Sequence, residues 1–106
     1  MPKYLLQATY SADGIEGLLK EGGTGRRARV KKAIKSLGGA VESFYFAFGD
    51  ADAIVIASLP DNASAAALAL AVGASGLVGI RTTVLLTPEE VDEAASKSAA
   101  YSAPGQ

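Results

Sequence analysis

The sequence predicts an α+β domain of the ferredoxin-like type, with the element order β-α-β-β-α-β and a short helix at its C-terminal end. Four segments alternate their apolar residues with the period of a β-strand, and two segments between them place apolar residues at helical spacing. A Gly-Asp turn joins the second strand to the third, as in a β-hairpin. With 106 residues, one domain over 1–106 is expected, with 99–106 as a flexible tail.

The first half of the chain predicts a strand, a weak helix and a basic helix. Residues 3–10 are rich in apolar and aromatic side chains that alternate as in a strand. Gly14 and Gly17 are each expected to weaken the following helix by about 1 kcal/mol relative to alanine. Glycines within 22–25 interrupt that helix, and a second helix is expected over about 24–37, where two further glycines end it.

The middle of the chain predicts a β-hairpin. Residues 40–48 place three phenylalanines on one face of a strand, and residues 49–51 form a tight turn. Residues 52–59 are apolar on both faces, so this strand is expected at the centre of the sheet and covered on both sides. The whole sheet is expected to be antiparallel and four-stranded, with both long helices on one face.

The remainder predicts an Ala-rich helix, the fourth strand and a final helix. The Ala-rich helix is capped by Asp61 or Asn62 and runs to about residue 74. It carries no surface charge, so we expect it to pack on more than one side. Residues 78–87 form the fourth strand. Thr87-Pro88-Glu89-Glu90 is a capping box that begins the last helix.

One segment has nearly the length of a membrane span. Residues 62–80 contain no charged residue, which is 19 residues in a row. Alanine, glycine and serine dominate the segment, and its glycines end a helix early, so we expect no membrane contact. The first residues lack the basic, apolar and small-residue pattern of a secretory signal. We therefore expect a cytoplasmic protein.

The predicted sheet has one face that the chain itself leaves bare. With both helices on one side, the other side carries Leu5, Tyr45, Leu85 and one face of the apolar strand 52–59. Soluble monomers rarely expose so large an apolar patch. We expect a second copy to cover it, sheet against sheet, in a homodimer or a higher even oligomer. The alternative is that the final helix or the tail folds over this face.

Composition excludes several kinds of chemistry. The chain has no cysteine and no histidine, so disulfides, thiolate or imidazole metal ligands and a Ser-His-Asp relay are absent. No metal and no cofactor are expected. The chain has 10 basic and 11 acidic residues, a net charge of −1.

The residues resemble the GYD-domain family, small bacterial proteins grouped with the dimeric α/β-barrel superfamily. The resemblance covers Lys3 to about Tyr101 and implies the fold and a dimeric barrel, whereas the family's biochemical activity is unassigned. The family is named for a Gly-x-Tyr-Asp motif, which reads Gly49-Asp50-Ala51-Asp52 here, so any role of that tyrosine is absent or moved. The segments that carry the resemblance are Gly17-Leu18-Leu19-Lys20-Glu21-Gly22-Gly23, Arg26-Arg27, Ser36-Leu37-Gly38-Gly39, Phe44-Tyr45-Phe46-Ala47-Phe48-Gly49, Leu59-Pro60-Asp61-Asn62 and Thr82-Thr83-Val84-Leu85-Leu86-Thr87-Pro88-Glu89-Glu90.

An anion site is one candidate, at the start of the basic helix. Glycines before a helix leave backbone N–H groups free, the helix dipole favours an anion there, and two arginines add charged donors. A phosphate or carboxylate would fit. The alternative is a flexible helix junction with solvated arginines. The candidate residues are Gly23, Thr24, Gly25, Arg26 and Arg27.

The basic helix is a second candidate surface. Six of the ten basic residues lie within 26–35, which suggests contact with nucleic-acid phosphates. The chain as a whole is slightly acidic and no aromatic residue lies among these charges, so a solvated face is favoured over nucleic acid. An equal possibility is pairing with the acidic stretch 89–93 of this or another subunit.

A third candidate is the bare face of the sheet, as the interior of the barrel. Polar residues lie there on otherwise apolar strands, which is the general form of a small-molecule site. In dimeric barrels of the superfamily that the chain resembles, ligand pockets lie in the barrel interior or between sheet and helices. The alternative is that these groups bond one another across a dimer interface. The candidates are Gln7, Thr9, Tyr45, Asp52, Arg81 and Thr83.

Three functions follow, in order. The first is a homo-oligomeric module that binds a small, possibly anionic ligand or serves assembly, without catalysis. The second is a cofactor-free enzyme of isomerase or monooxygenase type, with Asp52 or Tyr45 as the acid–base group and Arg81 holding an anion. The third, nucleic-acid binding, is the least favoured. No substrate, reaction or pathway is identified by these residues.

Overall fold

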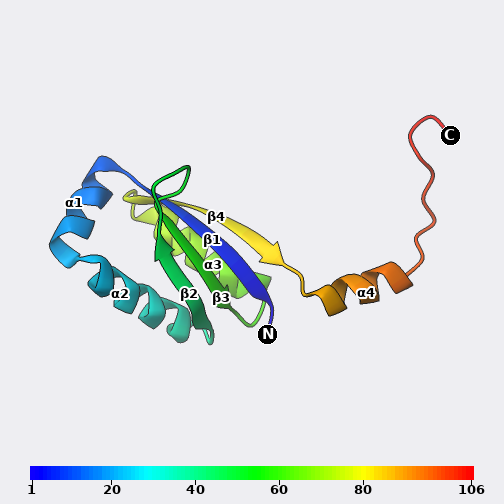
Figure 1. Cartoon of the computed structure of the whole chain (residues 1–106), viewed down its shortest axis with the longest axis horizontal. Helices are drawn as coiled ribbons and strands as arrows, with labels where there is room; N and C mark the ends of the chain where they lie inside the picture. The colour runs from blue at the N-terminus through cyan, green and yellow to red at the C-terminus, as the bar shows by residue number, and fades with distance from the viewer.

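The computed structural model describes all 106 residues and confirms the ferredoxin-like α+β fold (Figure 1). The sheet has the strand order β2-β3-β1-β4, and every neighbouring pair is antiparallel. In chain order the elements are β1 (Lys3–Tyr10), α1 (Ala12–Glu21), α2 (Gly23–Ser36), β2 (Ala40–Phe46), β3 (Ala53–Ser58), α3 (Asn62–Ala74), β4 (Val78–Leu85) and α4 (Pro88–Ser96).

Side-chain caps fix where the helices begin. The Ser11 hydroxyl accepts from the Gly14 N–H at 3.1 Å, and the Asp61 carboxylate accepts from the Ser64 N–H at 2.8 Å. Hydrogen bonds from the Ser64 side chain and backbone lower the pKa of Asp61. Thr87 begins α4 in the predicted capping box. Because Thr87 caps this helix, β4 ends at Leu85 and is shorter than predicted.

Gly22 makes the junction between the first two helices. Its φ of +81° lies in the left-handed region that favours glycine, and its N–H donates to the Leu18 carbonyl. The chain passes from α1 to α2 within this one residue. The interruption predicted from the glycines of 22–25 is therefore confirmed.

The core lies between one face of the sheet and the helices. Tyr4, Leu6, Val55 and Ala57 point to that side, and Ile34 from α2 packs into the same buried cluster. The Tyr4 hydroxyl donates to the Asn62 side chain at 2.7 Å, which satisfies the one polar atom of a ring that is 1% exposed. Together these contacts hold β1 and β3 at the centre of the sheet.

The outer side of α3 differs from the prediction. Ala65 and Leu68 are buried against the sheet, but Leu70 is 74% exposed and no other element covers it. Within one chain α3 therefore packs on one side only, because the fold has a single helix layer. The expectation of packing on several sides is wrong for the isolated chain.

The end of the chain stands apart from the body. All residues of 88–106 are exposed, and α4 projects beyond the end of β4 (Figure 1). The alternative in which α4 or the tail covers the bare sheet face is therefore not what the structure shows.

Two glycines of α1 give a matched test of packing. A β-carbon at Gly14 would lie 2.1 Å from the Leu77 carbonyl oxygen, whereas one at Gly17 would meet nothing within 4 Å. The equal penalty predicted for both glycines is therefore wrong, because α1 needs Gly14 to approach the chain before β4.

We expect Gly14→Ala to destabilise the fold by about 1–3 kcal/mol through overpacking. Gly17→Ala should stabilise it by about 0.5–1 kcal/mol through helix propensity. Urea denaturation of both variants measures the difference. Equal effects of the same sign would contradict this account of α1.

Candidate functional site

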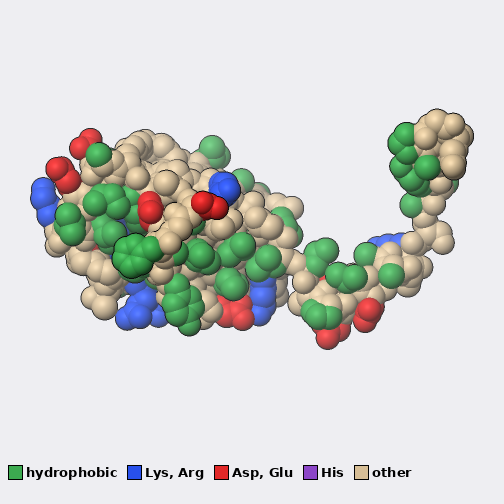
Figure 2. Space-filling model, turned by 45° about the horizontal axis from the view of Figure 1, so that its top comes forward, with side chains coloured by type: hydrophobic (Ala, Val, Ile, Leu, Met, Phe, Trp, Pro, Cys, Tyr) green, Lys and Arg blue, Asp and Glu red, His purple; other side chains and the backbone are tan.

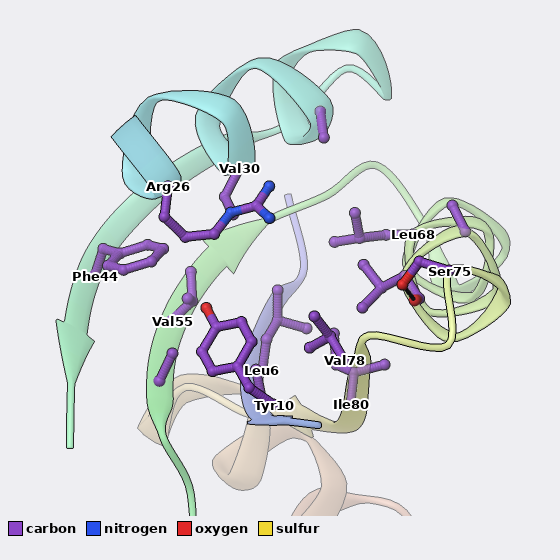
Figure 3. A pocket seen from close by; sticks show the side chains of 15 residues that line it. Leu6, Tyr10, Arg26, Val30, Phe44, Val55, Leu68, Ser75, Val78 and Ile80 are labelled. Atoms are coloured by element: carbon purple, nitrogen blue, oxygen red, sulfur yellow. Dashed lines mark hydrogen bonds between the residues drawn. The ribbon is translucent and has the colours of Figure 1, made fainter. Parts of the chain in front are cut away.

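An apolar cavity lies between the sheet and helices α2 and α3 (Figure 3). Its volume is about 300 Å³, at the small end of the range for ligand pockets. The strands supply its floor and the two helices its walls. The lining residues are Leu6, Ala8, Tyr10, Arg26, Val30, Ala33, Phe44, Ala53, Val55, Leu68, Ala71, Val72, Ser75, Val78 and Ile80.

Arg26 is the only charged residue of this lining. It follows the first turn of α2, and in Figure 3 its side chain extends over the cavity above the Tyr10 ring. Its Nε is buried and makes no hydrogen bond. The nearest carboxylate oxygen, Glu21 Oε2, is 3.6 Å from this nitrogen. A donor of a permanent cation is thus left unsatisfied at an apolar cavity.

The Tyr10 hydroxyl is the second polar group at this edge of the cavity. Burial raises the pKa of Tyr10; the negative charges of Glu21 and Asp52 raise it further, and Arg26 lowers it. The phenol is therefore neutral at physiological pH and can donate a hydrogen bond. Tyr10 and Arg26 together form a donor pair above an otherwise apolar floor.

Glu21 supplies a negative charge beside this pair. Its Oε1 is 2.9 Å from Arg29 Nε in an ion pair, although neither Oε1 nor Arg26 Nε makes a hydrogen bond. A second hollow, of about 410 Å³, is lined by Glu21 and Arg29 and shares Tyr10, Arg26 and Val78 with the apolar cavity. A polar approach therefore adjoins the apolar space, with Arg26 between them.

The five residues predicted to bind an anion are separated by the structure. Gly23, Thr24 and Gly25 form the first turn of α2, and Arg27 is exposed outside the cavity. Only Arg26 reaches the cavity. Because Glu21 already lies beside Arg26 and Arg29, the start of α2 has an internal counter-charge, and anion binding by the glycine turn stays a prediction.

The residues predicted for the barrel interior lie on the side of the sheet away from the cavity. Gln7 stands opposite Arg81 on β4 and Ile54 on β3, and Ile54 in turn stands opposite Tyr45 on β2. Thr83 lies one pair further along, and Thr9 lies opposite a glycine. Their side chains make no hydrogen bonds with one another, so their role in binding stays a prediction.

Asp52 holds the ends of two strands together. Its carboxylate accepts from the Tyr10 N–H at 2.8 Å, and its own N–H donates to the Ala8 carbonyl at 2.8 Å. Gly49 lies in the loop before it, and Ala51, at the place of the motif tyrosine, is 4% exposed. The carboxylate of this motif thus has a structural partner, and Tyr45, the other suggested acid–base group, is 70% exposed.

The sequence analysis placed Arg26 at a helix start and overlooked the cavity. A signal was present, since residues 26, 30, 33 and 37 fall on one helical stripe, with arginine at its first position. Tyr10 and Phe44 also reach the cavity, but from strands whose distance to α2 no spacing rule gives. No cluster of three metal-ligating side chains exists, and no helix has the length and apolarity needed to cross a membrane.

Comparison with known proteins places the chain in a family. The family model described as GYD domain matches residues 4–95, which is nearly the whole chain. The chain therefore belongs to the GYD-domain family. No curated protein and no solved structure matches it.

Asp52→Ala is expected to destabilise the fold by about 1.5–3 kcal/mol, because the Tyr10 N–H loses a charged acceptor. Asp52→Asn keeps a side-chain oxygen and should cost less. Asp50→Ala, in the same loop and exposed, serves as the control and should leave stability unchanged. Thermal unfolding of the three variants measures this, and wild-type stability of Asp52→Ala would exclude the structural role.

Proposed function

We propose that this member of the GYD-domain family binds a small apolar molecule that carries one anionic group, in the cavity between the sheet and helices α2 and α3. One observation carries the proposal. Arg26 holds a buried, unsatisfied Nε over a cavity whose other lining side chains are almost all apolar.

The chemistry of the cavity selects the ligand class. An apolar body gains by leaving water for a lining of alanine, valine, leucine, isoleucine and phenylalanine side chains. A carboxylate head accepts charge-assisted hydrogen bonds from Arg26 and a neutral one from the Tyr10 hydroxyl. A short or branched aliphatic carboxylate, or a single-ring aromatic one, suits a space of about 300 Å³.

Binding without catalysis suits this lining better than turnover. Tyr10, Arg26 and Ser75 are its only polar side chains, and none of them is a base at neutral pH. Asp52, Tyr45 and Arg81, the residues of the enzymatic alternative, do not line the cavity. This supports a carrier or sensor of the ligand over an isomerase or monooxygenase.

Calorimetric titration with octanoate, and with 1-octanol as its uncharged counterpart, tests the proposal. Arg26→Gln is expected to weaken octanoate binding about tenfold or more, since a hydrogen bond to a charged group contributes roughly 1.5–3 kcal/mol. Octanol binding should change little. Arg27→Gln, one position along the same helix and exposed, is the matched control and should bind both probes as the wild type does.

Glu21→Gln extends the same titration. It removes the carboxylate that competes for Arg26, so octanoate should bind more tightly than to the wild type, with octanol unaffected. Equal affinity of the wild type for octanoate and octanol, or no heat with either, would refute the proposed ligand class.

We also propose that the chain assembles as a homodimer or higher even oligomer through the bare face of its sheet. Leu5, Ile56 and Ile54 stand at the centre of this face, on paired positions of β1 and β3, and Tyr45 and Leu85 extend it to the two edge strands. No element of the chain covers these side chains. An apolar face of this extent is uncommon on a monomer, which supports the proposal.

Ile56→Lys is expected to convert the oligomer to monomer, because it places a charge at the centre of the face to be buried. Sedimentation velocity at micromolar concentration measures the change, with circular dichroism to check the fold. Leu70→Lys, on the exposed side of α3, is the control. A monomeric wild-type protein would disprove assembly through this face.

A further inference from the structure

Helix α4 is a formed helix without a partner. Its capping box is complete, yet none of its residues is buried. Figure 1 shows α4 projecting from the end of β4 away from the body, and the molecule measures 56 × 32 × 24 Å along its principal axes. A nine-residue helix is marginal alone in water. It therefore needs a docking surface.

Two different sides of α4 are available for docking. Glu89, Asp92 and Glu93 follow the i, i+3, i+4 spacing and form an acidic row. Val91 and Ala95 form an apolar stripe that borders this row next to Asp92. Val91 is 51% exposed, and the only ion pair of the helix joins Glu93 to Lys97 at 3.9 Å. Figure 2 shows hydrophobic and acidic side chains exposed together on this arm.

Helix α2 and strand β2 present the complementary surfaces. Arg27, Lys31 and Lys35 repeat every four residues, so they form one exposed basic row, and none of them takes part in an ion pair. The row shares its flank of α2 with Gly23, where a β-carbon would lie 3.1 Å from the Phe46 ring. Beside that flank runs β2, an edge strand with an unpaired side.

From these features we infer that α4 of one copy docks in the angle between α2 and β2 of a second copy. The acidic row of α4 then faces the basic row of α2. The apolar stripe faces the edge strand, where Phe46 is 42% exposed and Phe48 is fully exposed. Docking also covers the unpaired edge of β2, which otherwise invites non-specific strand pairing.

The topology favours a second copy over the same chain. β4 and β2 are opposite edges of the sheet, three strand spacings or about 14 Å apart. Only Leu86 and Thr87 separate β4 from α4, and two residues span at most about 7 Å. The helix thus begins on the far side from its own α2 and points outward. The inference rests on the self-association proposed above and adds to it an exchanged arm.

Two charge-reversed variants of the full chain test the exchange. The first carries Glu89→Lys, Asp92→Lys and Glu93→Lys on the arm. The second carries Arg27→Glu, Lys31→Glu and Lys35→Glu on α2. Each variant alone places like charges at both arm contacts of a homodimer. A one-to-one mixture places opposite charges at both contacts of a heterodimer, because each altered surface meets its complement.

At low ionic strength, each variant alone is expected to self-associate about tenfold or more weakly than the wild type. The mixture should form heterodimers well above the statistical fraction in native mass spectrometry, and added salt should remove the preference. Leu70→Lys, outside both surfaces, should mix statistically with the wild type.

Other outcomes overturn the inference. If both variants self-associate as the wild type does, while Ile56→Lys is monomeric, the sheet interface stands and the exchanged arm is wrong. If the mixture shows no heterodimer preference although each variant is weakened, α4 docks within its own chain. If reversal on α2 abolishes retention on double-stranded DNA and leaves self-association unchanged, the basic row serves nucleic acid.

Discussion

Burial of one face of a four-stranded sheet is the constraint on which this structure depends. Tyr4, Leu6 and Val55 turn toward the helices, and the strand period then turns their neighbours the other way. One helix layer cannot cover both sides of a sheet. The same alternation that builds the core therefore produces the bare face that needs another copy, and it separates that face from the cavity.

The cavity follows from small side chains on that inner face. Ala8 and Ala53 form part of its floor, and Ala33 and Ala71 part of its walls, where larger residues would have closed the gap between α2 and α3. An unfilled apolar cavity lowers the stability of a fold. A ligand that fills it restores those contacts, and Arg26 at its edge then gives the site a preference for charge.

Charge in this protein is arranged between elements and is nearly balanced in total. The basic residues gather on α2 and the acidic ones on α4, while α3 carries none. Glu21 neutralises part of the α2 charge from the end of α1, and it does so on the flank that faces the cavity. The opposite flank keeps its charge, so ligand binding and arm docking use different sides of one helix.

The sequence by itself determined the elements and their order, because period, caps and glycine turns act over a few neighbouring residues. It also marked Gln7, Tyr45 and Arg81 as sharing one face, since strand alternation is local. Only the tertiary structure decided that Asp52 binds the Tyr10 N–H, that Gly14 meets Leu77 and that Arg26 overhangs a cavity. Each of those contacts joins residues far apart in the chain, and their distances depend on how helices pack on the sheet. Local patterns carry no information about that packing.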